Sequence, residues 1–135
     1  MVTVFDAEPG QLIGKVADKL KEMKIPAPHF IGLVKSGAHA QRPPADEDFW
    51  FKRCASILRQ IYVNDIVGVN RLRRHYGGRK RGTMHREHHV PAGGSTIRKA
   101  MQALEKEGLL KKEKVGRIIS AKGRKLMDAA ARECA

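Results

Sequence analysis

The sequence predicts a mainly α-helical fold, in which a helical bundle surrounds a central amphipathic helix and a short C-terminal β-hairpin adds winged-helix-like character. Three observations support this fold class. Apolar residues recur at helical spacing in several segments, one segment concentrates the aromatic residues, and the C-terminal part has the order helix, glycine, two short strands, helix. The chain has 135 residues, which is enough for one hydrophobic core and too few for two. We therefore expect residues 1–135 to form a single domain.

The first expected helix covers residues 6–23. Asp6 or Glu8 can cap its start, and Pro9 suits its first turn. Residues 35–45, which contain glycine and prolines, predict a loop after this helix. Apolar residues recur at intervals of three and four along the helix, which indicates one buried stripe: Leu12, Ile13, Val16, Leu20 and Met23.

The central helix is expected over residues 49–63. Three acidic residues, 46–48, precede it, where the helix dipole favours negative charge. It begins with three consecutive aromatic residues, in a chain with an aromatic content of only 5%. Its predicted inner face is apolar and consists of Trp50, Cys54, Ile57, Leu58 and Ile61. We predict that the rest of the bundle packs around this helix.

The most basic part of the chain is residues 71–89, which overlaps a short helix expected over residues 69–76. This part carries seven arginines and lysines against the single acid Glu87, and Gly77 and Gly78 interrupt it. Because it has few apolar residues, we predict an exposed, mobile loop. Arginine binds phosphates through two parallel hydrogen bonds and stacks on unpaired bases, so such a loop suits an irregular RNA.

The pattern of the C-terminal part is typical of a winged-helix domain. Ser95 or Thr96 can cap a helix that Gly108 ends, and residues 109–113 and 117–120 predict two strands joined by a short turn. Winged helices bind DNA, RNA or other proteins, so this fold by itself does not decide the function.

A final helix, capped by Ser120, is expected to run to about residue 132. In a DNA-binding winged helix, the helix from Ser95 would enter the major groove and the hairpin would contact the backbone. The contacts in that alternative would be basic: Arg98, Lys99, Lys106, Lys111, Lys112, Lys114 and Arg117.

The charge of the chain favours a nucleic-acid partner. Lysine and arginine total 27 against 14 acids, which gives a net charge of +13. Such a domain repels itself unless a polyanion neutralises it. A membrane partner is not expected, because no stretch approaches the ~20 apolar residues of a spanning helix and the N-terminus does not have the pattern of a signal peptide. Cys54 and Cys134 form no disulfide framework, which suggests a reducing, cytoplasmic setting.

No catalytic or cofactor motif is present in the sequence. The glycine pairs match neither the Walker nor the dinucleotide-binding pattern, and the acids cluster at helix starts. His75, His85, His88 and His89 lack a nearby cysteine and the usual ligand spacing, so no metal site is expected. We expect no enzymatic activity, no cofactor and no small-molecule substrate.

Three motifs, in this order, resemble one known family. Residues 49–62, FWFKRCASILRQIY, look like its aromatic–Arg–Ala-Ser–Arg–Tyr helix, and residues 76–82, YGGRKRG, look like its Tyr-Gly-Gly-Arg loop. Residues 98–105, RKAMQALE, look like its signature helix. The family is small-subunit ribosomal protein nineteen of the "e" type, found in archaea and eukaryotes, whose human member is mutated in Diamond–Blackfan anaemia. The resemblance covers nearly the whole chain.

The resemblance implies a structural constituent of the small ribosomal subunit. It implies binding to ribosomal RNA in the subunit head, on the 3′ major domain, and a need for the protein in small-subunit assembly and maturation. Small-subunit ribosomal RNA and neighbouring small-subunit proteins are the implied partners, and the ribosome in the cytoplasm is the implied location. The alternative is a winged-helix DNA-binding transcription regulator, which would be a dimer, whereas we expect a monomer when the protein is free.

The candidate RNA contacts combine the basic segment with the positions that match the family's basic patch, Arg53, Arg59 and Arg98. The full predicted set is Lys52, Arg53, Arg59, Arg71, Arg73, Arg74, Tyr76, Arg79, Lys80, Arg81, Arg86, Arg98 and Lys99. The order Phe-Trp-Phe and the His-rich residues 85–91 depart from the family pattern. The compact linker and short tail are more typical of archaeal than of eukaryotic members.

Overall fold

The computed structural model describes residues 2–82, 84 and 86–134. A 3-10 turn, η1 (Val4–Asp6), precedes the first helix. The helices in these residues are α1 (Pro9–Glu22), α2 (Phe49–Asn64), α3 (Val69–Tyr76), α4 (Gly94–Lys106) and α5 (Ala121–Cys134). The strands are β1 (Gly78–Lys80), β2 (His88–Val90), β3 (Leu110–Lys112) and β4 (Arg117–Ile119), and they form two separate antiparallel hairpins. The predicted mainly α, winged-helix-like fold class is confirmed.

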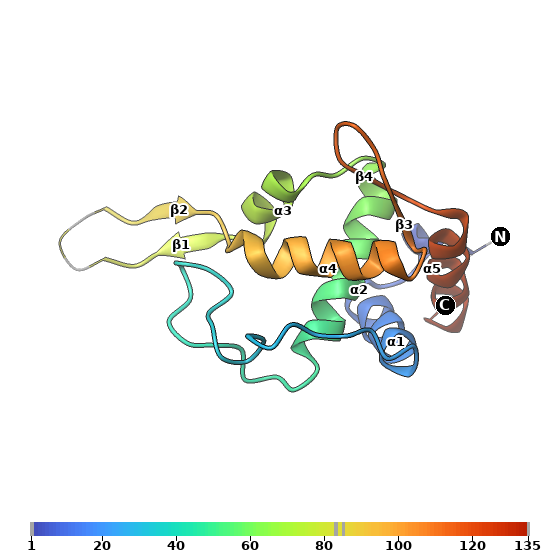
Figure 1. Ribbon diagram of the computed structural model, residues 1–135, viewed down its shortest axis with the longest axis horizontal. Helices are drawn as coiled ribbons and strands as arrows, with labels where there is room; N and C mark the ends of the chain where they lie inside the picture. Colours follow the sequence, from blue (N-terminus) through green and yellow to red (C-terminus); the bar gives the residue numbers. More distant parts are fainter. Residues whose placement is uncertain (1, 83, 85, 135) are drawn as a thin grey trace.

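Helix α2 is the centre of the core, as predicted. It contacts α1, α4, α5 and strand β4, and Figure 1 shows it behind α4 and between the other helices. Its predicted inner face is correct, because each of these side chains is at most 2% exposed: Trp50, Cys54, Ile57, Leu58 and Ile61. Burying each large apolar side chain contributes about 1.5–3 kcal/mol. The three outer helices are therefore held to α2 mainly by apolar contact.

The C-terminal hairpin and the last helix follow the prediction closely. Strands β3 and β4 pair with Leu110 opposite Ile119 and Lys112 opposite Arg117. Ser120 caps α5: the backbone N–H of Gly123 donates to its hydroxyl at 3.1 Å, and the hydroxyl donates to the Gly108 carbonyl at 2.5 Å. The side chain at position 120 thus ties the end of α4 to the start of α5.

One predicted helix start is correct in one of its two alternatives, and another is wrong. Glu8 holds the N-cap position of the first helix and Pro9 is its first residue, although the Glu8 side chain makes no capping hydrogen bond. Asp6 instead closes a separate turn, in which its carboxylate accepts a hydrogen bond from the Thr3 N–H at 2.9 Å. Helix α4 begins at Gly94, so Ser95 lies inside it and does not cap it. The N–H of Gly93, the residue before α4, donates to the Ser36 carbonyl at 2.8 Å and holds the chain where this helix begins.

The basic segment forms a hairpin, where a loop was predicted. Strand β1 pairs with β2, with Gly78 opposite Val90 and Lys80 opposite His88, and the hairpin projects from one end of the molecule (Figure 1). Its arginines and lysines are exposed, as predicted. The mobility of the segment stays a prediction, and His85 lies outside the described residues. Pairing satisfies the backbone hydrogen bonds of a segment with few apolar side chains to bury.

The base of this hairpin is held by the long segment between α1 and α2. Gly37 forms a β-bridge with Ala92, and the ring of His39 lies against Gly78. A Cβ atom at Gly78 would lie 2.8 Å from that ring, and one at Gly77 would lie 2.3 Å from the Val90 carbonyl oxygen. Glycine is therefore needed at positions 77 and 78, because the chain there lies too close to Val90 and His39 to leave room for a Cβ atom. None of the described helices is long and apolar enough to span a bilayer.

A glycine substitution tests this packing. We expect Gly77→Ala to lower the free energy of unfolding by about 1–3 kcal/mol, because the new methyl group would overlap the β2 backbone. Gly14→Ala, in the middle of α1, is the matched control: a Cβ there meets no atom within 4 Å, and alanine favours the helix by about 0.5–1 kcal/mol. Urea unfolding of both variants measures the difference, and equal effects would contradict the close approach.

The two thiols provide a second test of the core. Burial raises the pKa of the Cys54 thiol to about 12, whereas Cys134 is only partly buried. Because the thiolate is the reactive form, we expect a thiol reagent at neutral pH to modify Cys134 in the folded protein and Cys54 only after unfolding. Mass spectrometry of the modified peptides identifies the site, and rapid modification of Cys54 in the native state would show that the core is open.

Candidate nucleic-acid interface

Helix α3 brings predicted site residues from three helices together. It has eight residues, and Leu72 is its one buried side chain among them. Tyr76, at its C-terminal end, lies against α2, and Arg73, one turn earlier, lies against α4. One residue, Gly77, separates Tyr76 from the β1–β2 hairpin. The position of Tyr76 places the arginines of α2 and α4 at the base of that hairpin.

Arg53 is held between two aromatic rings. Its guanidinium carbon lies 4.0 Å from the ring centre of Tyr76 and 5.1 Å from that of Phe49. Burial lowers the pKa of the Arg53 guanidinium from its usual value, although arginine stays charged in proteins. A cation over an aromatic face is stabilised by the ring. These contacts also position the flat guanidinium, whose N–H groups can donate to an oxygen acceptor.

Tyr76 is itself held in place by α2. Its hydroxyl and that of Ser56 lie 2.5 Å apart in a hydrogen bond. Burial raises the pKa of the Tyr76 phenol, so it stays protonated at neutral pH. The structure places this ring under Arg53, where it supports the arginine.

Arg59 lies near the same tyrosine, six residues after Arg53 on α2. Its positive charge favours the ionised form of Tyr76 and so opposes the effect of burial on the pKa of that phenol. Its Nε atom is buried and has no hydrogen-bond partner among the residues that the structure describes. A buried donor without an acceptor costs about 1–3 kcal/mol. The Nε–H of Arg59 is therefore available to an acceptor that no described residue supplies.

Arg73 and Arg98 approach each other over the start of α4. Arg73 donates from Nε to the Ala92 carbonyl at 2.9 Å, which fixes its side chain across the end of β2. A Cβ at Gly94 would lie 3.3 Å from Cδ of Arg73 and 3.7 Å from a terminal nitrogen of Arg98. Two like charges this close repel each other unless an anion lies nearby. We call Arg53, Arg59, Arg73, Tyr76 and Arg98 the arginine patch.

The remaining basic residues of the hairpin and of α3 are exposed. Arg79 forms an ion pair with Glu87 across the hairpin, at 3.3 Å. Arg71 donates to the side-chain oxygen of Asn64 at 3.3 Å. The other predicted contacts of this region point to solvent: Arg74, Lys80, Arg81 and Arg86.

Two predicted site residues lie apart from the arginine patch. Lys52 is in an ion pair with Asp46 at 2.5 Å, and the pKa of its ammonium group is raised by this hydrogen bond. Lys99 lines a groove of about 330 Å³ between α4 and residues 26–30. In the sequence, Lys52 is next to Arg53 and Lys99 is next to Arg98. In the structure, each lysine lies on a different face of its helix from the neighbouring arginine.

The position of the same groove is evidence against the DNA-binding alternative. Lys99 and Lys106 of α4 form one wall, and Pro26 and Phe30 belong to the opposite wall. A recognition helix must present its outer face freely to enter a major groove. In this protein, the segment between α1 and α2 lies along that face. The geometry thus disfavours duplex readout by α4.

Two supporting residues, Phe49 and Ser56, are not among the predicted site residues. Phe49 lies four residues before Arg53 on one helix, and this spacing is the signal that could have identified the aromatic–arginine contact. The contact between Ser56 and Tyr76 joins residues 20 positions apart, and no local pattern indicates it. Among the described residues, which exclude His85, no three metal-binding side chains lie together.

Comparison with known proteins identifies the family. The family Ribosomal protein S19e matches residues 3–135. The small ribosomal subunit protein eS19 of Aeropyrum pernix is 42% identical, over 98% of this chain and 90% of the relative. The eS19 of Haloarcula marismortui is 40% identical, over 95% and 88%, and the eS19B of Schizosaccharomyces pombe is 40% identical, over 94% and 90%. The resemblance of the three motifs is confirmed, and the chain belongs to the ribosomal protein S19e family.

Proposed function

We propose that the protein binds ribosomal RNA in the head of the small subunit, on the 3′ major domain, and is needed for assembly and maturation of that subunit. As an S19e protein, it is a structural ribosomal component and not an enzyme. Beyond family membership, we propose the ligand, its place in the small subunit and the residues that contact it. Neighbouring small-subunit proteins are its further partners, and it works in the cytoplasm as part of the ribosome.

The arginine patch is the observation that carries this proposal. Arg53 is stacked, Arg73 is fixed by a backbone carbonyl, and Arg59 has a buried donor without a partner in the described part of the chain. Arg53 and Arg73 are held by contacts within the protein, so binding through them costs little conformational entropy. Arginine forks match phosphate oxygens, which suits a folded RNA backbone.

The projecting hairpin complements the patch. Arg81 and Arg86 lie toward its tip, beyond the ion pair of Arg79 with Glu87, and both are exposed. A narrow two-stranded ribbon with a charged tip can enter an RNA junction, where phosphates from several strands come close together. We propose that the body docks through the arginine patch and that the hairpin tip enters such a junction and becomes ordered there.

Sedimentation tests the ribosomal assignment. We expect a tagged copy in a cell lysate to co-migrate with the small subunit through a sucrose gradient and to stay bound at moderate salt. Glutamine at Arg79, Lys80 and Arg81 should lower the salt at which it is released, because phosphate contacts make binding salt-dependent. The control variant carries glutamine at Lys15, Lys19 and Lys21 of α1 and loses the same charge. Protein that stays at the top of the gradient would contradict the assignment.

The stack at Arg53 gives a residue-level prediction. We expect Arg53→Gln to weaken binding to a transcript of the 3′ major domain about tenfold, since a charge-assisted hydrogen bond contributes about 1.5–3 kcal/mol. Tyr76→Ala should weaken it similarly because the guanidinium loses its support. Tyr76→Phe keeps the ring and should bind nearly as well as the wild type. Filter binding at fixed salt measures all three.

Lys52→Gln is the matched control for this series. It removes one positive charge from the neighbouring position, but the ammonium group of Lys52 is already paired with Asp46. We expect its effect on RNA binding to be less than about threefold, in line with the small contribution of exposed ion pairs. Equal losses for Lys52→Gln and Arg53→Gln would show that net charge, and not the arginine patch, determines the affinity.

A further inference from the structure

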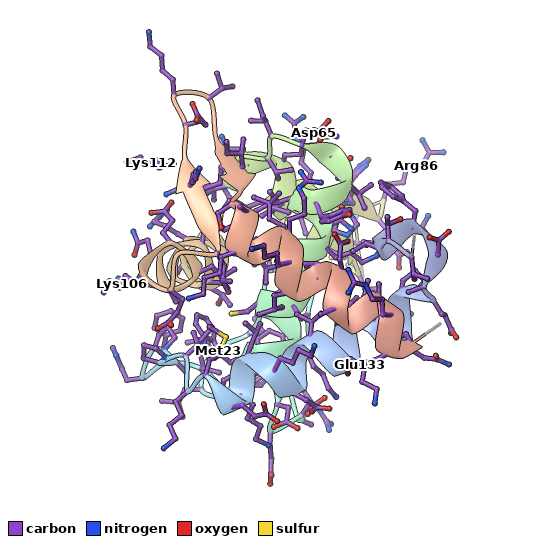
Figure 2. The ribbon with its side chains drawn as sticks, turned by 90° about the vertical axis from the view of Figure 1, so that its right-hand side faces the viewer. Met23, Asp65, Arg86, Lys106, Lys112 and Glu133 are labelled. Carbon is purple, nitrogen blue, oxygen red and sulfur yellow. The ribbon has the colours of Figure 1, made fainter. Side chains whose placement is uncertain are left out.

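A second basic surface lies between the β3–β4 hairpin and the start of α3. A groove of about 360 Å³ separates the two elements. Lys112 and Lys114 line it from the hairpin, and Arg71 lines it from α3. Figure 2 shows Lys112 and Lys106 toward one side of the view and Glu133 of α5 toward the other. We call this feature the wing groove.

The wing groove is rigidly built. Val67 and Arg117 exchange two backbone hydrogen bonds, of 3.1 and 2.9 Å, which join the hairpin to the residues before α3. A Cβ at Gly116 would lie 2.8 Å from the Val67 carbonyl oxygen, so the two walls touch at this end of the groove. Its width is therefore set by backbone contacts and does not depend on flexible side chains.

The wing groove carries an excess of positive charge. Arg117 is neutralised by Glu105 at 2.5 Å, whereas Arg71 donates to the neutral side chain of Asn64 and forms no ion pair with a described residue. In the described part of the chain, neither Lys112 nor Lys114 forms an ion pair. Glu113 is the one acid among the residues that line the groove. Three free cations against one acid, on rigid walls, favour binding of a polyanion.

Helix α3 connects the wing groove to the arginine patch. Arg71 stands in its first turn, Tyr76 ends it, and the exposed Arg74 lies between them. In Figure 1, α3 lies between the two hairpins, and β1–β2 extends away from β3–β4. Basic side chains thus continue from the tip of one hairpin along α3 to the other. A ligand in the wing groove would meet the N-terminal end of α3, whereas Tyr76 of the arginine patch lies at its C-terminal end.

We propose that the wing groove binds the phosphate backbone of a second RNA segment, separate from the one at the arginine patch. Lys112, Lys114 and Arg71 are its phosphate contacts. The inference rests on the proposed RNA-binding function and extends it, because a protein with two such surfaces holds two parts of the RNA in a fixed relation. A duplex backbone suits the groove, since no aromatic side chain lines it for stacking on bases.

The test compares two double variants of the full-length protein. Lys112→Gln with Lys114→Gln removes two charges from the wing groove, and Lys111→Gln with Lys125→Gln removes two exposed charges outside it. The probe is a transcript of the 3′ major domain of archaeal small-subunit ribosomal RNA. Affinity is measured over a range of salt, hydroxyl-radical footprinting maps the protected nucleotides, and circular dichroism verifies that each variant is folded.

We expect the wild type to protect two separate RNA segments. The groove variant should lose one of them and lower the slope of log affinity against log salt by about 2, at roughly 0.9 per phosphate contact. The control variant should keep both segments and most of the slope. Arg53→Gln should weaken the other segment. If the groove and control variants behave alike, the wing groove is not an RNA site, although the protein still binds RNA. If the wild type protects no RNA, the proposed function fails as well.

Discussion

The burial of helix α2 is the constraint on which the rest of the structure depends. Its apolar face packs against α1, α4 and α5, and its buried residues include both the aromatic Trp50 and the small Ala55. This packing leaves one side of α2 outside the core, where Arg53 and Arg59 stand half-buried. The arginines are thus anchored on the most rigid element of the core. A binding group on such an element keeps its geometry better than one on a loop.

The positions of the acidic residues explain where the excess positive charge of the chain lies. Several acids pair with lysines around α1 and α2: Asp48 with Lys21, Asp46 with Lys52, and Glu133 with Lys19. These pairs neutralise one side of the molecule. The excess positive charge therefore gathers on α3 and the two hairpins. A net charge of +13 predicted a polyanionic partner, and this distribution indicates which surface meets it.

Helix α3 contributes little to the core but organises the binding surface. Only Leu72 of its eight residues is buried. Its polar residues instead contact α2 through Tyr76 and the end of β2 through Arg73. Such an element would be unstable alone, because short helices are marginal in water. Its polar contacts to the core hold it in place and at the same time arrange the arginines.

The sequence by itself determined the faces of the helices, the C-terminal hairpin, the cap at Ser120 and the family. These features follow from local periodicity, turn chemistry and motif order, which a single chain reveals. Only the tertiary structure decided that Tyr76 lies under Arg53, that Lys52 is paired with an acid, and that the basic segment forms a hairpin. Periodicity indicates that a residue is buried or exposed, but not which distant residue it meets. Those contacts depend on how the core packs.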